Sequence, residues 1–313
     1  MTSLRRLAYG TLTLAYLQIV FGAIVRITGS GLGCGDHWPD CYGSFTPAHR
    51  GFALLIEISH RYGAAVLSTA VAALVLLAFV EREERGVSGP GGVLRSSLLA
   101  AGLVVTAALV GAVTVKVGLN PVVVATHLAI AMSLLGVLSV TVIRAGGLGA
   151  TGNLTGATSR TWRAASIAIA LAALTLILGA LTANLPGAAD SCGGFPWCRS
   201  IEAGGIGLAV QVTHRIVAFL LFGHLWGVAA ALPKRDEPTV VVRAARVAFG
   251  AAIVQVLIAA AMVEMHLPTV LRSLHQAAGT FVWLSVCVFA VLARRASPAR
   301  EEAPEPALMG AHA

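Results

Sequence analysis

Residues 53–80 read ALLIEISHRYGAAVLSTAVAALVLLAFV, an apolar run with Glu57, His60 and Arg61 near its start. The run exceeds the roughly 20 residues that an α-helix needs to cross a bilayer. Of the 313 residues in the chain, 57% are hydrophobic and 12% are charged, against roughly 25% charged residues in ordinary soluble domains. The mean hydropathy is +0.83. These values predict an integral membrane protein, and they raise the question of why three polar side chains interrupt an apolar span.

Similar apolar runs recur along the chain, and we predict that all of them are helices. Backbone groups exposed to lipid must satisfy their own hydrogen bonds, and the runs lack the alternation typical of barrel strands. The first run is too long for a removed signal peptide and has no small-residue cleavage site, so we expect it to be retained. The fold class is therefore all-α with eight transmembrane helices, predicted at residues 4–27, 53–80, 94–115, 122–143, 163–184, 205–231, 243–263 and 270–294.

The basic residues predict the orientation in the cell membrane. The loops of one side carry only Arg50, Lys116 and Arg199, and the positive-inside rule makes this side extracytoplasmic. Both termini would then be cytoplasmic. The net charge of +8 follows from this topology and from anionic lipid, so it does not indicate nucleic acid as a partner. The basic residues of the cytoplasmic side are Arg5, Arg6, Arg82, Arg85, Arg95, Arg144, Arg160, Arg163, Lys234, Arg235, Arg243, Arg246, Arg294, Arg295 and Arg300.

The two halves of the chain repeat the same motifs in the same order. GAIVRITGSGLGCGDHWPDC (22–41) precedes EISHRYGA (57–64), as GALTANLPGAADSCGGFPWC (179–198) precedes QVTHRIVA (211–218). Each half ends with a proline followed six or seven residues later by a histidine. Because each half has an even number of spans, the repeats share one orientation. We predict two tandem, pseudo-symmetric four-helix bundles, residues 1–150 and 151–296, followed by a disordered tail, 297–313.

Each predicted outer loop that follows the first span of a half contains two cysteines. Cys34 and Cys41 lie in the first of these loops, and Cys192 and Cys198 lie in the second. Disulfides persist outside the cytoplasm, so we expect both pairs to be disulfide-bonded. A zinc site that uses His37 is the weaker alternative, because the second loop contains no histidine.

Four of the nine histidines form a repeated set: His60, His127, His214 and His275. They lie five to ten residues inside the outer ends of the second and fourth helices of each half, about 8 to 14 Å deep. Facing side chains in bundle cores build cofactor sites, and neutral imidazole ligates haem iron. We therefore predict two bis-histidine haem sites, with helix-bridging hydrogen bonds as the alternative. Di-iron and copper sites fit poorly, because the Glu-x-x-His spacing occurs once and no Cys or Met accompanies the histidines. The other histidines, His37, His49, His224, His266 and His312, have structural or solvent-exposed interpretations.

The polar neighbours of these histidines differ between the halves. Glu57 lies three residues before His60, whereas Gln211 lies three residues before His214. A carboxylate can accept a proton and glutamine cannot, so the difference predicts chemistry in the first half only. In the alternative interpretation, Glu57 simply pairs with Arg61 at i+4. Arg61 and Arg215 are candidates either for contacts with haem propionates or for contacts with lipid headgroups.

Taken together, EISHR (57–61), THL (126–128), THR (213–215), LHQ (274–276) and the cysteine pairs resemble the haem A synthase family, over residues 5 to 295. The resemblance implies oxidation of the C8 methyl group of haem O to the formyl group of haem A, for terminal oxidases, through two hydroxylations and loss of water. It further implies that His60 and His127 hold the substrate haem and that His214 and His275 hold a haem B cofactor. Glu57 would be the catalytic carboxylate, and Cys34–Cys41 and Cys192–Cys198 the disulfides.

Two other classes of function stay open at this point. A dihaem b-type electron-transfer cytochrome would need both haems but no carboxylate beside one of them. A haem transporter or chaperone would use the four histidines as a relay and would convert nothing. The partners that we expect are haem O, the lipid bilayer, haem O synthase and cytochrome c oxidase assembly factors.

Overall fold

The computed structural model describes residues 1–46, 51–150, 154 and 156–297. Arg50, His49, Arg300, His312 and the predicted disordered tail beyond Ser297 lie outside the described residues. Within them, eight helices are long and apolar enough to cross a membrane, which confirms the predicted fold class. The helices are α1 (Thr2–Ile27), α2 (Phe52–Val80), α3 (Val93–Lys116), α4 (Pro121–Arg144), α5 (Ser159–Asn184), α6 (Gly205–Ala231), α7 (Thr239–Glu264) and α8 (Thr269–Ala296).

The helices extend one to four residues beyond several predicted spans. The Asn120 side chain caps α4 by accepting a hydrogen bond from the Val122 amide at 3.0 Å. Thr158 caps α5 in the same way, so that this helix begins four residues before the predicted span. Short elements complete the described part: a 3-10 turn at Leu232–Lys234 and a two-residue hairpin, β1 (Cys192–Gly193) with β2 (Ser200–Ile201).

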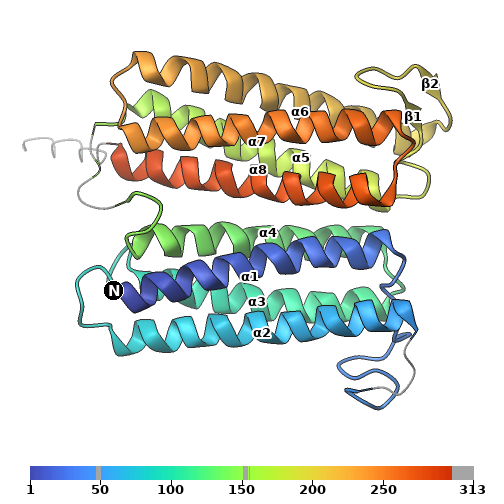
Figure 1. The fold of residues 1–313 in the computed structure, drawn as a ribbon, viewed down its shortest axis with the longest axis horizontal. Helices are drawn as coiled ribbons and strands as arrows, with labels where there is room; N and C mark the ends of the chain where they lie inside the picture. Colours follow the sequence, from blue (N-terminus) through green and yellow to red (C-terminus); the bar gives the residue numbers. More distant parts are fainter. Residues whose placement is uncertain (47–50, 151–153, 155, 298–313) are drawn as a thin grey trace, which may run out of the picture.

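Figure 1 shows two groups of four helices, α1–α4 and α5–α8, that lie side by side. Within each group, consecutive helices are neighbours and the fourth helix also packs against the first. The second and fourth helices of each group are therefore diagonal partners across a four-helix bundle. The loops that contain the cysteine pairs lie at the end of the molecule opposite the N-terminus (Figure 1).

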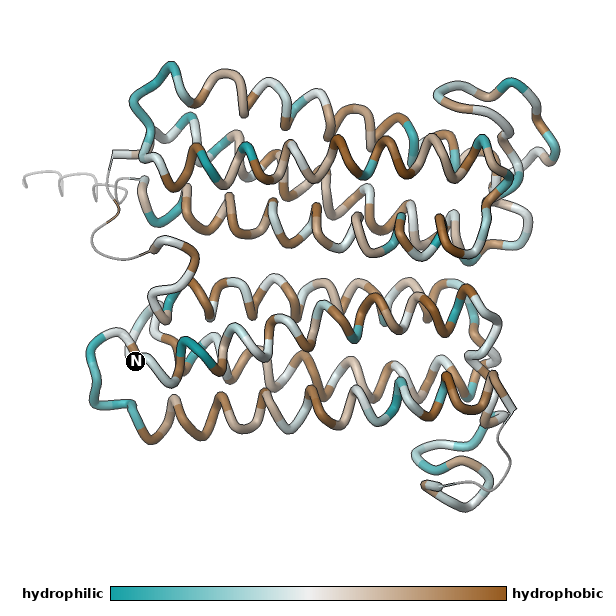
Figure 2. Tube along the Cα trace, in the orientation of Figure 1, coloured by the Kyte–Doolittle hydropathy of each residue, from teal (hydrophilic) through white to brown (hydrophobic). Residues whose placement is uncertain are grey.

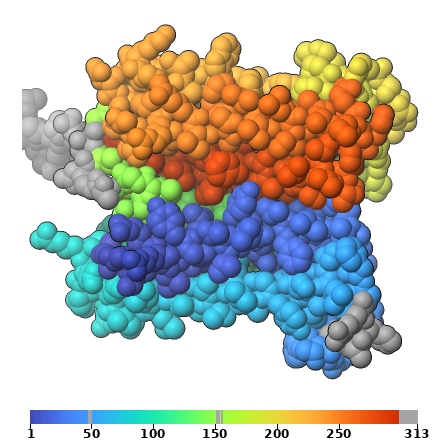
Figure 3. All heavy atoms as spheres, in the orientation of Figure 1, coloured from blue at the N-terminus to red at the C-terminus, as the bar shows by residue number. Residues whose placement is uncertain are grey.

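The two bundles meet along α1 and α4 on one side and α5 and α8 on the other. In Figure 3 the atoms of α8 lie between those of α7 and α1. Leu134, Leu135 and Leu138 of α4 belong to the buried core of the first bundle, and Trp283 of α8 packs against that core. Large apolar side chains such as Leu76 and Leu257 stay exposed on the outer helix faces. Figure 2 shows these apolar helix bodies between more hydrophilic ends, an arrangement that suits lipid.

Candidate functional site

The structure brings each predicted histidine into a bundle, against a glycine or glutamine of a neighbouring helix. His60 of α2 lies against Gly22 of α1, where a Cβ atom would stand 3.0 Å from the ring carbon Cε1. The side-chain amide nitrogen of Gln18, one turn earlier in α1, lies 2.8 Å from His60 Nδ1 and donates to the His60 carbonyl oxygen at 2.8 Å. A side chain at position 22 would therefore push the ring of His60 back by a few tenths of an ångström.

The second bundle repeats this arrangement. A Cβ atom at Gly179 of α5 would lie 2.9 Å from Cε1 of His214. The Nδ1 atom of His214 lies 3.0 Å from the carbonyl oxygen of Thr175, which precedes Gly179 by one turn as Gln18 precedes Gly22. A carbonyl can only accept, so Nδ1 carries the proton and Nε2 keeps a free lone pair. Histidines that ligate metals typically donate their other ring nitrogen in this way.

The histidines of α4 and α8 face the same bundle interiors. A Cβ atom at Gly111 of α3 would lie 3.1 Å from Cε1 of His127, and among the described residues His127 Nδ1 is buried without a hydrogen-bond partner. His275 Nδ1 lies 3.1 Å from the amide nitrogen of Gln255 in α7. Because α2 and α4, like α6 and α8, are diagonal in their bundles, the two histidines of each bundle come from helices on opposite sides of it.

A cavity lies in the interior of the second bundle and reaches the interface with the first. Its volume is about 240 Å³, just below the about 300 to 1,000 Å³ of typical small-molecule pockets. His214 and His275 both line it, together with aromatic side chains that include Phe219 and Trp283. Two histidines from diagonal helices, one with a free Nε2, and aromatic side chains in the lining of the same cavity fit the ligation of a haem.

Three arginines line this cavity, and the sequence motifs identified only one of them. Arg215 of α6 follows His214, whereas Arg26 comes from the end of α1 and Arg272 from the first turn of α8. Arg26 donates to the carbonyl oxygen of Ala183 in α5 at 3.0 Å, across the bundle interface. Arg26 and Arg272 both lie inside predicted spans, where ionisable groups are costly. Their position in the sequence could therefore have identified them as candidate site residues.

Glu57 lies beneath the first disulfide loop. Its side chain is 4% exposed, and Oε2 accepts a hydrogen bond from the Cys34 amide at 2.8 Å. Oε1 pairs with Arg61, so the i+4 salt bridge of the alternative interpretation is present. Arg61 also donates to the carbonyl oxygens of His37 at 2.8 Å and Asp40 at 2.7 Å. The Glu57–Arg61 pair therefore fixes the loop over the histidine site.

Gln211 and Arg215 fix the second loop in the same way. Gln211 accepts from the Ser191 hydroxyl and donates to the Ala189 carbonyl oxygen, each at 2.8 Å. Arg215 donates to the carbonyl oxygens of Cys192 and Gly194, each at 2.7 Å.

Terminal nitrogens of both Arg61 and Arg215 thus already donate to loop carbonyls. Their contacts with propionates stay a prediction.

Both cysteine pairs are disulfide-bonded, with Cα–Cα distances of 5.0 Å for Cys34–Cys41 and 5.1 Å for Cys192–Cys198. This confirms the predicted pairing, and the zinc alternative is wrong. In the part of the chain that the structure describes, no group of three or more His, Cys, Asp or Glu side chains could hold a metal ion. Of the remaining histidines, His224 hydrogen-bonds to the Ala164 carbonyl oxygen at 2.8 Å, which fits its predicted structural role.

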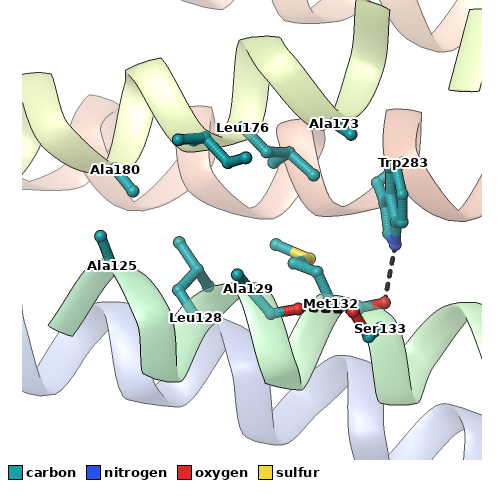
Figure 4. A pocket seen from close by; sticks show the side chains of 10 residues that line it. Ala125, Leu128, Ala129, Met132, Ser133, Ala173, Leu176, Ala180 and Trp283 are labelled. Carbon is teal, nitrogen blue, oxygen red and sulfur yellow. Dashed lines mark hydrogen bonds between the residues drawn. The ribbon is translucent and has the colours of Figure 1, made fainter. Parts of the chain in front are cut away.

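An apolar groove separates the bundles where α4 faces α5 (Figure 4). Leu128 and Leu176 line both this groove and the cavity. Trp283 of α8 points toward α4, and its indole N–H donates to the Met132 carbonyl oxygen at 2.8 Å. The groove thus lies next to the cavity of the second bundle.

A family model described as cytochrome oxidase assembly protein (COX15-CtaA) matches residues 5–287, which include all four histidines, Glu57 and both disulfides. The chain belongs to this family. The relatives that this chain matches include proteins named Heme A synthase. That of Bacillus pumilus is 36% identical over 135 residues, 42% of this chain and 41% of the relative. That of Staphylococcus saprophyticus is 34% identical over 122 residues, 39% of this chain and 38% of the relative.

A protein of Thermus thermophilus named Protoheme IX farnesyltransferase also matches this chain, with 45% identity over 71 residues. The match covers 23% of this chain and 12% of that relative. The chain thus spans about two fifths of the length of the Heme A synthases that it matches, and much less of the farnesyltransferase. These matches confirm the resemblance to haem A synthases.

Proposed function

We propose that this protein is a haem A synthase, an oxidoreductase that converts the C8 methyl group of haem O to a formyl group. One observation carries the proposal. The histidine sites of the two bundles are built alike, yet a buried carboxylate, Glu57, stands in the first where Gln211 stands in the second. Family membership and the relatives named Heme A synthase support the same activity.

In this proposal the two bundles hold different haems. His214 and His275 bind a resident haem B in the second cavity, and His60 and His127 bind the substrate, haem O. The free Nε2 of His214 supports ligation by this ring. A bound haem B would supply a one-electron redox centre. Glycines of neighbouring helices accommodate the rings of His60, His127 and His214.

Glu57 acts as the proton acceptor beside the substrate methyl group. Arg61 and the Cys34 amide hold both carboxylate oxygens, so the group keeps a fixed position under the loop. The salt bridge and the catalytic role are compatible, since a hydrogen-bonded carboxylate can still exchange a proton with bound water or substrate. The disulfide loop over Glu57 would limit the access of bulk water to the site.

The protein resides in the cell membrane, with cytoplasmic termini and extracytoplasmic disulfide loops. The distribution of basic residues supports this orientation. Haem O would come from haem O synthase, and the segment similar to this chain within the Thermus farnesyltransferase supports a direct transfer between the two enzymes. The product would pass to factors that assemble cytochrome c oxidase.

The test is to incubate the purified protein with haem O under oxidising conditions and to separate the extracted haems by chromatography. We expect haem A from the wild type and only haem O from Glu57→Gln. Glu264→Gln is the matched control, because Glu264 also accepts from a loop amide, that of Phe195 at 2.9 Å, and pairs with an arginine, Arg199. This control should convert haem O like the wild type.

The same experiment separates the rival functions. Unchanged haem O in the wild type, with haems that take up and release electrons, would indicate a dihaem electron carrier. Unchanged haem O without redox activity would indicate a haem transporter. Loss of all haem from Glu57→Gln would make Glu57 a structural residue.

A further inference from the structure

The cavity of the second bundle contains positive charge that the proposed function does not use. Arg26, Arg215 and Arg272 line it, and the lining residues include no aspartate or glutamate. Within the described residues, none of the three guanidinium groups has a carboxylate partner within 4.0 Å. Charged groups at membrane depth are expensive unless something compensates them. The cavity therefore has an excess of cationic donors over anionic acceptors.

Arg215 is already engaged, because its two terminal nitrogens donate to loop carbonyls. Arg26 uses one terminal nitrogen to donate to the Ala183 carbonyl oxygen in the last turn of α5. A guanidinium has five N–H donors in a planar fork, so most donors of Arg26 stay available. Its carbonyl contact stabilises the end of α5, but this contact does not explain why the side chain lines a cavity in the other bundle.

Arg272 occupies an electrostatically unfavourable position. It lies in the first turn of α8, where the helix dipole favours anions and disfavours cations. Arg26 of α1 and Arg272 of α8 nevertheless line the same cavity. Two guanidinium groups without a carboxylate partner can bind an anionic ligand there through charge-assisted hydrogen bonds.

We propose that Arg26 and Arg272 form a clamp for the two carboxylates of the tetrapyrrole that His214 and His275 hold. The inference rests on the proposed function, since it takes haem as the ligand of this cavity. Two arginine forks match two carboxylates in charge and geometry. Because Arg26 comes from the first bundle, the bound haem would also join the two bundles.

The clamp is absent from the repeat. Counted from Gly22 and Gly179, the position of Arg26 corresponds to Ala183, and counted from His127 and His275, the position of Arg272 corresponds to Val124. Neither alanine nor valine can bind a carboxylate. The clamp would therefore retain the haem of the second bundle, whereas a haem in the first bundle, without these arginines, can be exchanged.

The test compares ferric haem B with its dimethyl ester, in which both carboxylates are masked, by absorbance titration of the haem-depleted full-length protein. The variants are Arg26→Gln and Arg272→Gln, and Lys116→Gln is the control because Lys116 does not line the cavity. His275→Ala identifies the signal that belongs to the second cavity. Transfer of bound haem to apomyoglobin measures retention.

We expect each arginine variant to bind haem B roughly ten- to a hundredfold more weakly, the effect of losing a charge-assisted hydrogen bond. The same variants should bind the ester like the wild type, which shows that they are folded. Equal affinity of the wild type for haem and ester, or equal losses for both ligands, would overturn the clamp. If haem B binds as expected but the wild type does not convert haem O, the proposed function is wrong while the clamp is still supported.

Discussion

Gly179→Ala tests whether the close approach of helix α5 builds the second histidine site. The added methyl group would lie 2.9 Å from Cε1 and 3.3 Å from Nδ1 of His214. Ordinary contact begins at 3.4 Å, so the ring must retreat by about 0.5 Å. The 3.0 Å hydrogen bond from Nδ1 to the Thr175 carbonyl would then lengthen to about 3.5 Å, beyond the usual range.

The energetic cost follows from these distances. Overpacking costs about 1 to 3 kcal/mol, and the lost hydrogen bond adds about 1 kcal/mol. Replacing a helical glycine by alanine returns about 0.5 to 1 kcal/mol. We therefore expect a net loss of about 1 to 3 kcal/mol in unfolding free energy, together with weaker binding of haem at His214.

The assay combines thermal unfolding in detergent, followed by circular dichroism, with the absorbance spectrum of the haem that we propose for the second bundle. Gly223→Ala in α6 is the matched control, because nothing lies within 4 Å of the added methyl group. Gly22→Ala should disturb His60 in the first bundle and leave the resident haem spectrum unchanged. If Gly179→Ala matched Gly223→Ala in both stability and spectrum, the glycine would not be what positions the histidine.

Three further predictions concern single positions. Gly33→Ala would place a methyl group 2.5 Å from the Ala53 backbone, so we expect the unfolding free energy to fall by about 1 to 3 kcal/mol. The Cys34–Cys41 disulfide should also be reduced faster, as measured by thiol labelling. An unchanged rate of labelling would contradict this expectation. Trp283→Phe removes the hydrogen bond from the indole N–H to the Met132 carbonyl oxygen between the bundles, so we expect the unfolding free energy to fall by about 1 kcal/mol. An unchanged unfolding free energy would refute this expectation. His266 has a φ of 58°, a conformation that glycine adopts more easily. We therefore expect His266→Gly to raise the unfolding free energy by about 0.5 kcal/mol in the same assay. A lower unfolding free energy would show that the His266 backbone is not strained.

The helices were predictable because their cause is local. A continuous apolar run must form a helix in lipid wherever it occurs, so each span could be identified without its neighbours. Only the helix ends shifted, as at α5, where the Thr158 cap adds a turn that hydropathy does not detect. The disulfides were equally accessible, since Cys34–Cys41 and Cys192–Cys198 are separated by only seven and six residues.

The candidate site was only partly predictable. The repeat identified His60 and His214 with their Glu57 and Gln211 neighbours, because these residues share one helix. It did not identify Gln18, which contacts His60 from a different helix. It also left open whether Glu57 pairs with Arg61, a pairing that the structure contains.

The sequence by itself determined the eight spans, the tandem repeat and the four histidines, because hydropathy and spacing act within a single segment. Only the tertiary structure decided which residues of different bundles meet. Arg26 reaches the cavity of the second bundle because α1 packs against α8 and its guanidinium contacts the end of α5. Such contacts depend on how helices distant in sequence pack in space, and the repeat gives no sign of them because Arg26 has no counterpart in the other half.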